Sequence, residues 1–227
     1  MPSCGKASSN PEMSSRPLLL GHRGASKYAT ENSIEAFDLA LEHGCDGFEF
    51  DVRYTRDARC VICHDARYRH RSVAHRSFDE LNLPSAEQVI REYSSRAFLD
   101  IELKVSGDAR PILRALRKAR AKNYIISSFL PVVLHYAAAE DGDLSLGLIC
   151  ENFRQLRRWP TLPIRAVMMN WRLAEKSVIE ELQSARVQVF VWTVNGRREM
   201  ERMRELGVEA IISDDTKLLV EMLRAKG

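Results

Sequence analysis

The chain has 227 residues, of which 45% are hydrophobic and 29% are charged, and it contains 11 Gly and 8 Pro. This composition excludes a collagen-like, low-complexity or largely disordered chain, and no apolar run approaches the roughly 20 residues of a membrane-spanning helix. The net charge of +3, from 34 basic and 31 acidic residues, is too small to indicate a nucleic-acid-binding protein by itself. The length suits one large domain or two small ones.

Residues 1–17 contain Ser, Gly, Pro and Asn but no apolar segment of the kind found in a secretory signal. We therefore expect a flexible leader and a cytoplasmic protein. The five cysteines are irregularly spaced, which argues against a disulfide framework. Cys60 and Cys63 lie in one apolar run, where residues three apart on a strand face opposite sides roughly 10 Å apart. This geometry excludes both a disulfide and a shared zinc site.

After the leader, short apolar runs alternate with amphipathic segments. In chain order we predict strand 18–20, helix 33–42, strand 47–52, strand 60–64, helix 84–93, strand 98–103, helix 111–120, strand 124–128, helix 131–139, strand 144–149, helix 153–158, strand 166–169, helix 175–185, strand 187–194, helix 198–206, strand 210–213 and helix 217–225. Repeated strand–helix units predict a parallel sheet with helices outside it.

The predicted strands number nine, which is one more than an eight-stranded barrel needs. The gap between residues 52 and 60 is too short for a parallel crossover, which takes a dozen or more residues. We therefore expect a short antiparallel hairpin arm around residues 52–64, with a turn near Asp57 that places His64 opposite Phe50. The remaining eight strands predict a single-domain α/β protein, a TIM (β/α)8 barrel over residues 18–227.

Four acidic residues lie inside predicted strands. Glu49 and Asp51 share one face of a strand, and Glu102 lies with Asp100 on one face of a second strand. Because a buried, unpaired carboxylate pair is costly, either Glu49 and Asp51 both lie at the open top of the barrel or a cation neutralises them. Oxygen ligands suit Mg²⁺ or Ca²⁺. The alternative is a set of salt bridges to Arg23, Arg53 and Lys104.

Two histidines, His22 and His64, each follow an apolar strand, at the end that is catalytic in a barrel. They are either structural residues or groups that exchange protons near neutral pH. Arg23 offers a planar fork suited to phosphate, and Lys104 adds a second cation. This set favours phosphoryl chemistry, and the sequence lacks a Walker-type loop and a dinucleotide fingerprint. Trp192 is either a core residue or an apolar wall for substrate carbon.

The stretch from residue 53 to 76 is basic, with seven Arg, three His and two Asp. One interpretation is a solvated loop. The other is an electrostatic field beside His64 that attracts an anionic substrate.

Several motifs resemble those of the glycerophosphodiester phosphodiesterase family and occur in the family's order. They are His22-Arg23-Gly24, Glu31-Asn32-Ser33, Glu49-x-Asp51, His64-Asp65, Glu102-x-Lys104 and Trp192-Thr193-Val194-Asn195. The match runs from residue 18 to about residue 214, which is nearly the whole chain.

The resemblance implies a TIM barrel that hydrolyses glycerophosphodiesters to sn-glycerol 3-phosphate and an alcohol. It implies a divalent metal, Mg²⁺ or Ca²⁺, on Glu49, Asp51 and Glu102. His22 and His64 match the catalytic acid and base, and the attacking oxygen is the glycerol 2-hydroxyl or water. The matched substrate and phosphate positions are Arg23, Glu31, Lys104 and Trp192.

Two segments depart from the family pattern. Residues 66–82 are shorter and richer in Arg than the family's insertion, which predicts a more open site. The ending at residues 212–215, Ile-Ser-Asp-Asp, replaces a Thr-Asp-x-Pro-like sequence, and we expect no consequence.

We therefore expect a small glycerophosphodiester as partner, without nucleic acid or a membrane span, and the oligomeric state is open. Lysophospholipase D-type activity on lysophospholipids is one alternative. A non-catalytic phosphate-binding barrel is a second, and nucleic-acid binding through Arg67, Arg69 and Arg71 is a third.

Overall fold

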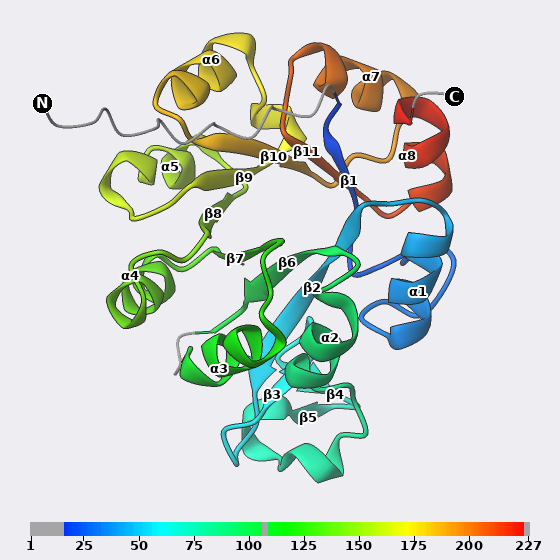
Figure 1. Ribbon diagram of the computed structural model, residues 1–227, viewed down its shortest axis with the longest axis vertical. Helices are drawn as coiled ribbons and strands as arrows, with labels where there is room; N and C mark the ends of the chain where they lie inside the picture. Colours follow the sequence, from blue (N-terminus) through cyan, green and yellow to red (C-terminus); the bar gives the residue numbers. More distant parts are fainter. Residues whose placement is uncertain (1–15, 106–108, 225–227) are drawn as a thin grey trace, which may run out of the picture.

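Eight parallel strands close into a barrel with helices around it, as the computed structural model shows for residues 16–105 and 109–224 (Figure 1). The barrel strands are β1 (Leu18–Gly21), β2 (Gly47–Tyr54), β6 (Phe98–Leu103), β7 (Tyr124–Ser128), β8 (Leu146–Cys150), β9 (Ala166–Asn170), β10 (Gln188–Trp192) and β11 (Ala210–Ser213). Each pairs in parallel with its neighbours, and β1 pairs with both β11 and β2, which closes the ring. The predicted TIM barrel is confirmed.

The helices lie outside the strands and agree with the predicted elements to within one or two residues at most ends. They are α1 (Ile34–Glu42), α2 (Ala86–Tyr93), α3 (Arg110–Ala119), α4 (Pro131–Glu140), α5 (Phe153–Leu156), α6 (Lys176–Ser184), α7 (Arg197–Glu205) and α8 (Thr216–Leu223). The start of α1 follows from capping, since the hydroxyl of Ser33 accepts a hydrogen bond from the Ala36 amide at 3.1 Å. Single 3₁₀ turns occur at Val73–His75, Phe78–Glu80, Trp159–Thr161 and Trp171–Leu173.

The predicted hairpin arm is present. Strand β3 (Cys60–Ile62) pairs antiparallel with β2, with Val52 opposite Ile62. That register, continued by two residues, sets His64 opposite Phe50 as expected. A second hairpin, β4 (Arg67–Tyr68) and β5 (Arg71–Ser72), follows and was not among the predicted elements.

Alternation along β2 separates the hydrophobic core from the interior of the barrel. Phe48 and Phe50 point outward, where the Phe48 ring stacks on Phe37 with centroids 4.3 Å apart. Glu49 and Asp51 point inward and are buried. An apolar layer fills the barrel beneath them and includes Leu20, Ile125, Met168, Phe190 and Ile212. The carboxylates therefore lie above this layer, toward the carboxyl ends of the strands.

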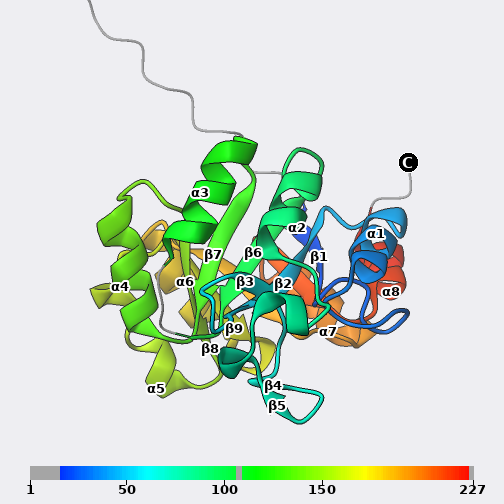
Figure 2. The same cartoon turned by 90° about the horizontal axis from the view of Figure 1, so that it is seen from below.

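The carboxyl ends of the strands form one face of the barrel, and the β4–β5 hairpin and α5 both lie at that face (Figure 2). At the start of the described chain, the Arg16 guanidinium donates two hydrogen bonds to the Asp46 carboxylate, at 2.7 and 2.8 Å. Arg16 belongs to the expected leader, of which residues 1–15 lie outside the described residues. No helix in the described ranges is long and apolar enough to cross a membrane.

The predicted separation of Cys60 and Cys63 is borne out, because the two residues belong to different apolar clusters. Cys45, Cys60, Cys63 and Cys150 are buried, and none of them forms a disulfide within the described residues. Cys4 lies outside the described residues.

Candidate active site

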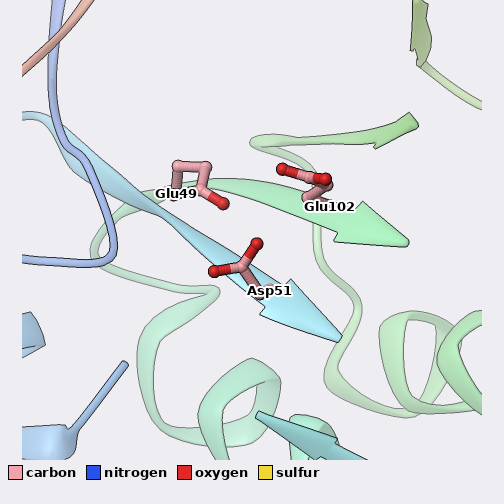
Figure 3. Close-up of side chains that lie close together, drawn as sticks. All are labelled: Glu49, Asp51 and Glu102. Atoms are coloured by element: carbon pink, nitrogen blue, oxygen red, sulfur yellow. The ribbon is translucent and has the colours of Figure 1, made fainter. Parts of the chain in front are cut away.

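Three carboxylates meet inside the mouth of the barrel (Figure 3). Glu49 and Asp51 come from β2, and Glu102 comes from β6, where it pairs in register with Asp51. One oxygen from each lies within 4.8 Å of the others, and all three residues are buried. Burial, and then the charge of Asp51, raise the pKa of both Glu49 and Glu102. This concentration of negative charge calls for a bound cation.

The carboxylates have unused ligand capacity. Glu49 Oε1 is buried without a hydrogen-bond partner. Lys104 Nζ lies 2.7 Å from Glu102 Oε1 and 3.3 Å from Asp51 Oδ1. The Lys104 ammonium and the Arg23 guanidinium, which also pairs with Glu31, do not neutralise all three carboxylates. Hard oxygen donors fit Mg²⁺ or Ca²⁺. The donor set therefore fits the divalent cation that the sequence predicts.

Left-handed backbone at Arg23 (φ 55°) and Asn32 (φ 58°) directs polar groups toward this cluster. The Arg23 amide donates to Glu49 Oε2 at 2.9 Å, and its Nε lies 3.3 Å from Asp51 Oδ2. The Asn32 amide group donates to the same Asp51 oxygen at 2.8 Å. Asn tolerates this conformation well, whereas Arg does so less readily. The local geometry thus fixes one side of each β2 carboxylate.

His22 follows β1 and is held by a residue at the end of β11. Its Nδ1 lies 2.7 Å from Asp214 Oδ1, and its Nε2 lies 4.0 Å from Glu49 Oε2. Asp214 also accepts hydrogen bonds from Ser26 at 3.0 Å and Asn195 at 2.6 Å. Burial raises the pKa of Asp214, but these hydrogen bonds outweigh it and lower the pKa to about 2. An ionised Asp214 fixes the Nδ1–H tautomer of His22 and leaves Nε2 facing the cavity.

His64 follows β3, the antiparallel partner of β2, and lines the same cavity. Arg53 Nε donates to the His64 carbonyl at 2.8 Å, which holds the backbone. The Nδ1 atom of His64 lies 2.9 Å from the carboxylate of Asp65, and the Asp65 side chain is 77% exposed. His64 is therefore more open to solvent and less tightly held than His22.

An apolar wall faces the charged half of a cavity of about 230 Å³. Phe129 and Trp192 contact edge to face, with ring centroids 5.8 Å apart, and the Trp192 indole donates to the Met168 carbonyl at 3.0 Å. The other apolar lining residues are Ile149, Met168 and Ile212. Trp192 is thus partly a packed residue and partly a cavity wall, and its contact with substrate carbon stays a prediction.

A comparison with protein families settles the kinship of the chain. The model of the glycerophosphoryl diester phosphodiesterase family matches residues 22–85 and 73–218. The chain belongs to this family.

Relatives of this phosphodiesterase cover it almost completely. A glycerophosphodiester phosphodiesterase of Caldanaerobacter subterraneus is 27% identical, over 93% of this chain and all of that protein. The Thermotoga maritima glycerophosphodiester phosphodiesterase has a similar fold, with a TM-score of 0.79 and 24% identity. The match covers 90% of this chain and 97% of that one. An Oleispira antarctica phosphodiesterase in complex with the product sn-glycerol-3-phosphate has a TM-score of 0.83 and 19% identity. The match covers 91% of this chain and 96% of that one. The two structures show the shared fold.

The structure places Glu31 at the edge of the site and the arginines of residues 53–76 outside the cavity lining. Glu31 is half exposed and accepts hydrogen bonds from Arg23 Nη1 at 3.0 and 2.9 Å. It therefore orients the guanidinium. Within the described residues, the basic side chains that line the cavity are Arg23, Lys104 and the two histidines, so the arginines of residues 53–76 do not line it.

Sequence reasoning missed several residues of the site. Asp214 carried a signal, because it follows a strand directly, as His22 does, yet its segment was expected to have no consequence. Asn32 was quoted within a motif without a role in the site. Phe129 and Glu151 also line the cavity, each just after a strand. Asp100, which the sequence had placed beside Glu102, also lines the cavity and accepts a hydrogen bond from the Ser127 hydroxyl at 2.6 Å. Burial raises the pKa of Asp100 to about 7.

Proposed function

We propose that this phosphodiesterase hydrolyses glycerophosphodiesters to sn-glycerol 3-phosphate and an alcohol, with a divalent cation and two histidines. The observation that carries the proposal is the meeting of Glu49, Asp51 and Glu102 beside His22 in one cavity. The product bound to the Oleispira antarctica relative supports the choice of substrate.

Glu49, Asp51 and Glu102 would hold the cation. When bound, Mg²⁺ or Ca²⁺ supplies positive charge for a nonbridging phosphate oxygen and lowers the pKa of a hydroxyl group. Arg23 and Lys104 flank the carboxylates, and their positive charges attract the phosphate to the same place. These residues would hold the phosphate in the cavity that both histidines line.

His22 is assigned as the general base. Its Nδ1 is engaged by ionised Asp214, so neutral Nε2 carries a lone pair toward the cavity. It takes the proton of the attacking oxygen while the new P–O bond forms. Attack by water would give sn-glycerol 3-phosphate directly, whereas attack by the glycerol 2-hydroxyl would first give a cyclic phosphate, which water then opens to sn-glycerol 3-phosphate. Asp214 stabilises the resulting imidazolium.

His64 is assigned as the general acid. It lines the same cavity as His22 and is more exposed to solvent, where a leaving alcohol would depart. It gives its proton to the leaving alkoxide as the old P–O bond breaks, and bulk water restores the starting state.

The cavity favours small, deacylated substrates over lysophospholipids. Its volume of about 230 Å³ lies below the roughly 300–1,000 Å³ of drug-sized ligand pockets. Phe129 and Trp192 provide apolar contact for glycerol carbons or for the alcohol.

The test is hydrolysis of glycerophosphocholine with Mg²⁺ or Ca²⁺, with sn-glycerol 3-phosphate and choline identified as products. His22→Ala and His64→Ala each lower kcat by about 10²–10⁴-fold, whereas exposed His135→Ala on α4 leaves it unchanged. Lysophosphatidylcholine in parallel should be the poorer substrate. Binding of glycerophosphocholine without turnover would instead support the non-catalytic barrel.

A further inference from the structure

The β4–β5 hairpin carries three arginines without acidic partners. Arg67, Arg69 and Arg71 are exposed, and no carboxylate of the described residues lies within ion-pair distance of them. The acids of the surrounding segment already contact other cations, since Asp79 lies 3.6 Å from Arg59 and Glu80 lies 3.8 Å from Arg56. The hairpin is therefore a free patch of positive charge.

The turn of this hairpin holds basic residues in an unfavourable backbone conformation. Arg67 pairs with Ser72 and Tyr68 with Arg71, so Arg69 and His70 form a two-residue turn. Both have positive φ, 47° and 65°, as a type I′ turn requires, and such turns favour Asn and Gly. The fold thus tolerates strain while it presents Arg69 and His70 at an exposed tip, which points to a function for those side chains.

Exposed apolar side chains gather on the same face of the barrel. Of the five large hydrophobic residues exposed in the described chain, four lie between residues 130 and 153. They are Leu130, Val132, Tyr136 and Phe153, with exposures of 36%, 43%, 60% and 41%.

Topology relates these side chains to the cavity. Leu130 follows the cavity residue Phe129, and Phe153 begins α5, two residues after Glu151 of the cavity lining. Val132 and Tyr136 are four residues apart on α4 and share one helix face. The β4–β5 hairpin and α5 both lie at the face that carries the carboxyl ends of the strands (Figure 2). The arginines of the hairpin and the apolar side chains that follow β7 and β8 therefore lie at the same end of the barrel.

We propose that this face docks onto an anionic lipid bilayer. Basic side chains are attracted to the charged headgroups, and exposed Leu, Val, Tyr and Phe side chains enter the boundary between headgroups and acyl chains. Because this is a claim about binding, it stands or falls separately from the reaction proposed above.

The experiment is co-sedimentation of the full chain with vesicles. Phosphatidylcholine vesicles containing phosphatidylglycerol should retain the protein, pure phosphatidylcholine vesicles should retain far less, and salt should weaken the binding. The triple change R67Q/R69Q/R71Q should lower the partition coefficient on the order of a hundredfold, since each basic residue near an anionic surface contributes about fivefold. The double change L130S/F153S should weaken binding without altering its salt dependence.

The matched control is K118Q/R120Q/K122Q, which removes three exposed cations from the α3–β7 connection at the opposite end of the barrel. It should bind vesicles like the unmodified chain. All variants should melt like it and hydrolyse a water-soluble glycerophosphodiester equally, which excludes misfolding. Equal binding to neutral and anionic vesicles, equal loss in the control, or binding of single-stranded RNA without vesicle binding would overturn the proposal.

Discussion

The Nδ1 atom of His22 lies 2.7 Å from Oδ1 of Asp214, although 192 positions separate the two residues in the chain. Closure of the barrel brings them together, because Gly21 of β1 pairs in register with Ser213 of β11. Asn195 holds the same corner, since its side-chain oxygen accepts from the Asp214 amide at 2.9 Å. Asp214 is therefore a positioning residue that acts through His22.

Asp214→Asn should lower kcat on glycerophosphocholine by about 10²-fold or more, because His22 loses the carboxylate that fixes its tautomer and stabilises its charged form. KM should change little, since Asp214 does not line the cavity in the described structure. The pH–rate profile should also shift in its acid limb.

The matched control is Asp65→Asn, which changes the corresponding partner of His64 Nδ1. Asp65 is 77% exposed, so its pairing is weak in water and its replacement should cost only a few-fold. A larger loss for Asp65→Asn than for Asp214→Asn would contradict the assigned positioning role.

The same carboxylate predicts a pH dependence of stability. The Asp214 pKa of about 2 lies below that of an unfolded aspartate, about 3.9. Its contribution to stability is thus fully present above pH ~4 and is lost as the pH falls toward about 2. Urea unfolding should show a difference between the unmodified chain and Asp214→Asn that is constant from neutral pH down to about 5 and shrinks below 4. A difference that grows on acidification would exclude this explanation.

Gly24 supports the loop that carries His22 and Arg23. Its φ is +82°, and a Cβ there would lie 2.6 Å from the Ala36 carbonyl carbon. Gly24→Ala should therefore destabilise the fold by about 1–2 kcal/mol for the left-handed backbone and by about 1–3 kcal/mol more for the overlap.

Gly207→Ala is the comparison, because Gly207 also has a positive φ, +72°, but no atom within 4 Å of the added Cβ. Gly207→Ala should therefore lower the free energy of unfolding only by the amount that the left-handed backbone accounts for. Equal unfolding free energies for the two variants, measured with urea, would show that the contact with Ala36 is unimportant.

Most of the barrel follows from local patterns in the sequence. Apolar runs alternate with amphipathic segments, and the short gap before Cys60 predicted an antiparallel arm. The inward face of β2 was also predictable, because Glu49 and Asp51 alternate with Phe48 and Phe50. These features depend on residues close together in the chain.

The features that could not be predicted from the sequence depend on closure of the barrel and on turns with unusual residues. The pairing of His22 with Asp214 requires β1 to meet β11, which no local pattern predicts. The β4–β5 hairpin was missed because its turn residues, Arg69 and His70, lack the Asn or Gly that marks such turns. The arginines of residues 53–76 lie outside the cavity lining because the chain folds back along β3 before most of them.

The most direct measurement is the activity of chelator-treated protein on glycerophosphocholine as Mg²⁺ or Ca²⁺ is added back. The proposed function predicts loss of turnover on chelation and recovery on addition of one of these ions, with no recovery in Glu49→Gln. Undiminished turnover in excess chelator, or unchanged activity of Glu49→Gln, would contradict the assignment of Glu49, Asp51 and Glu102 to a catalytic metal.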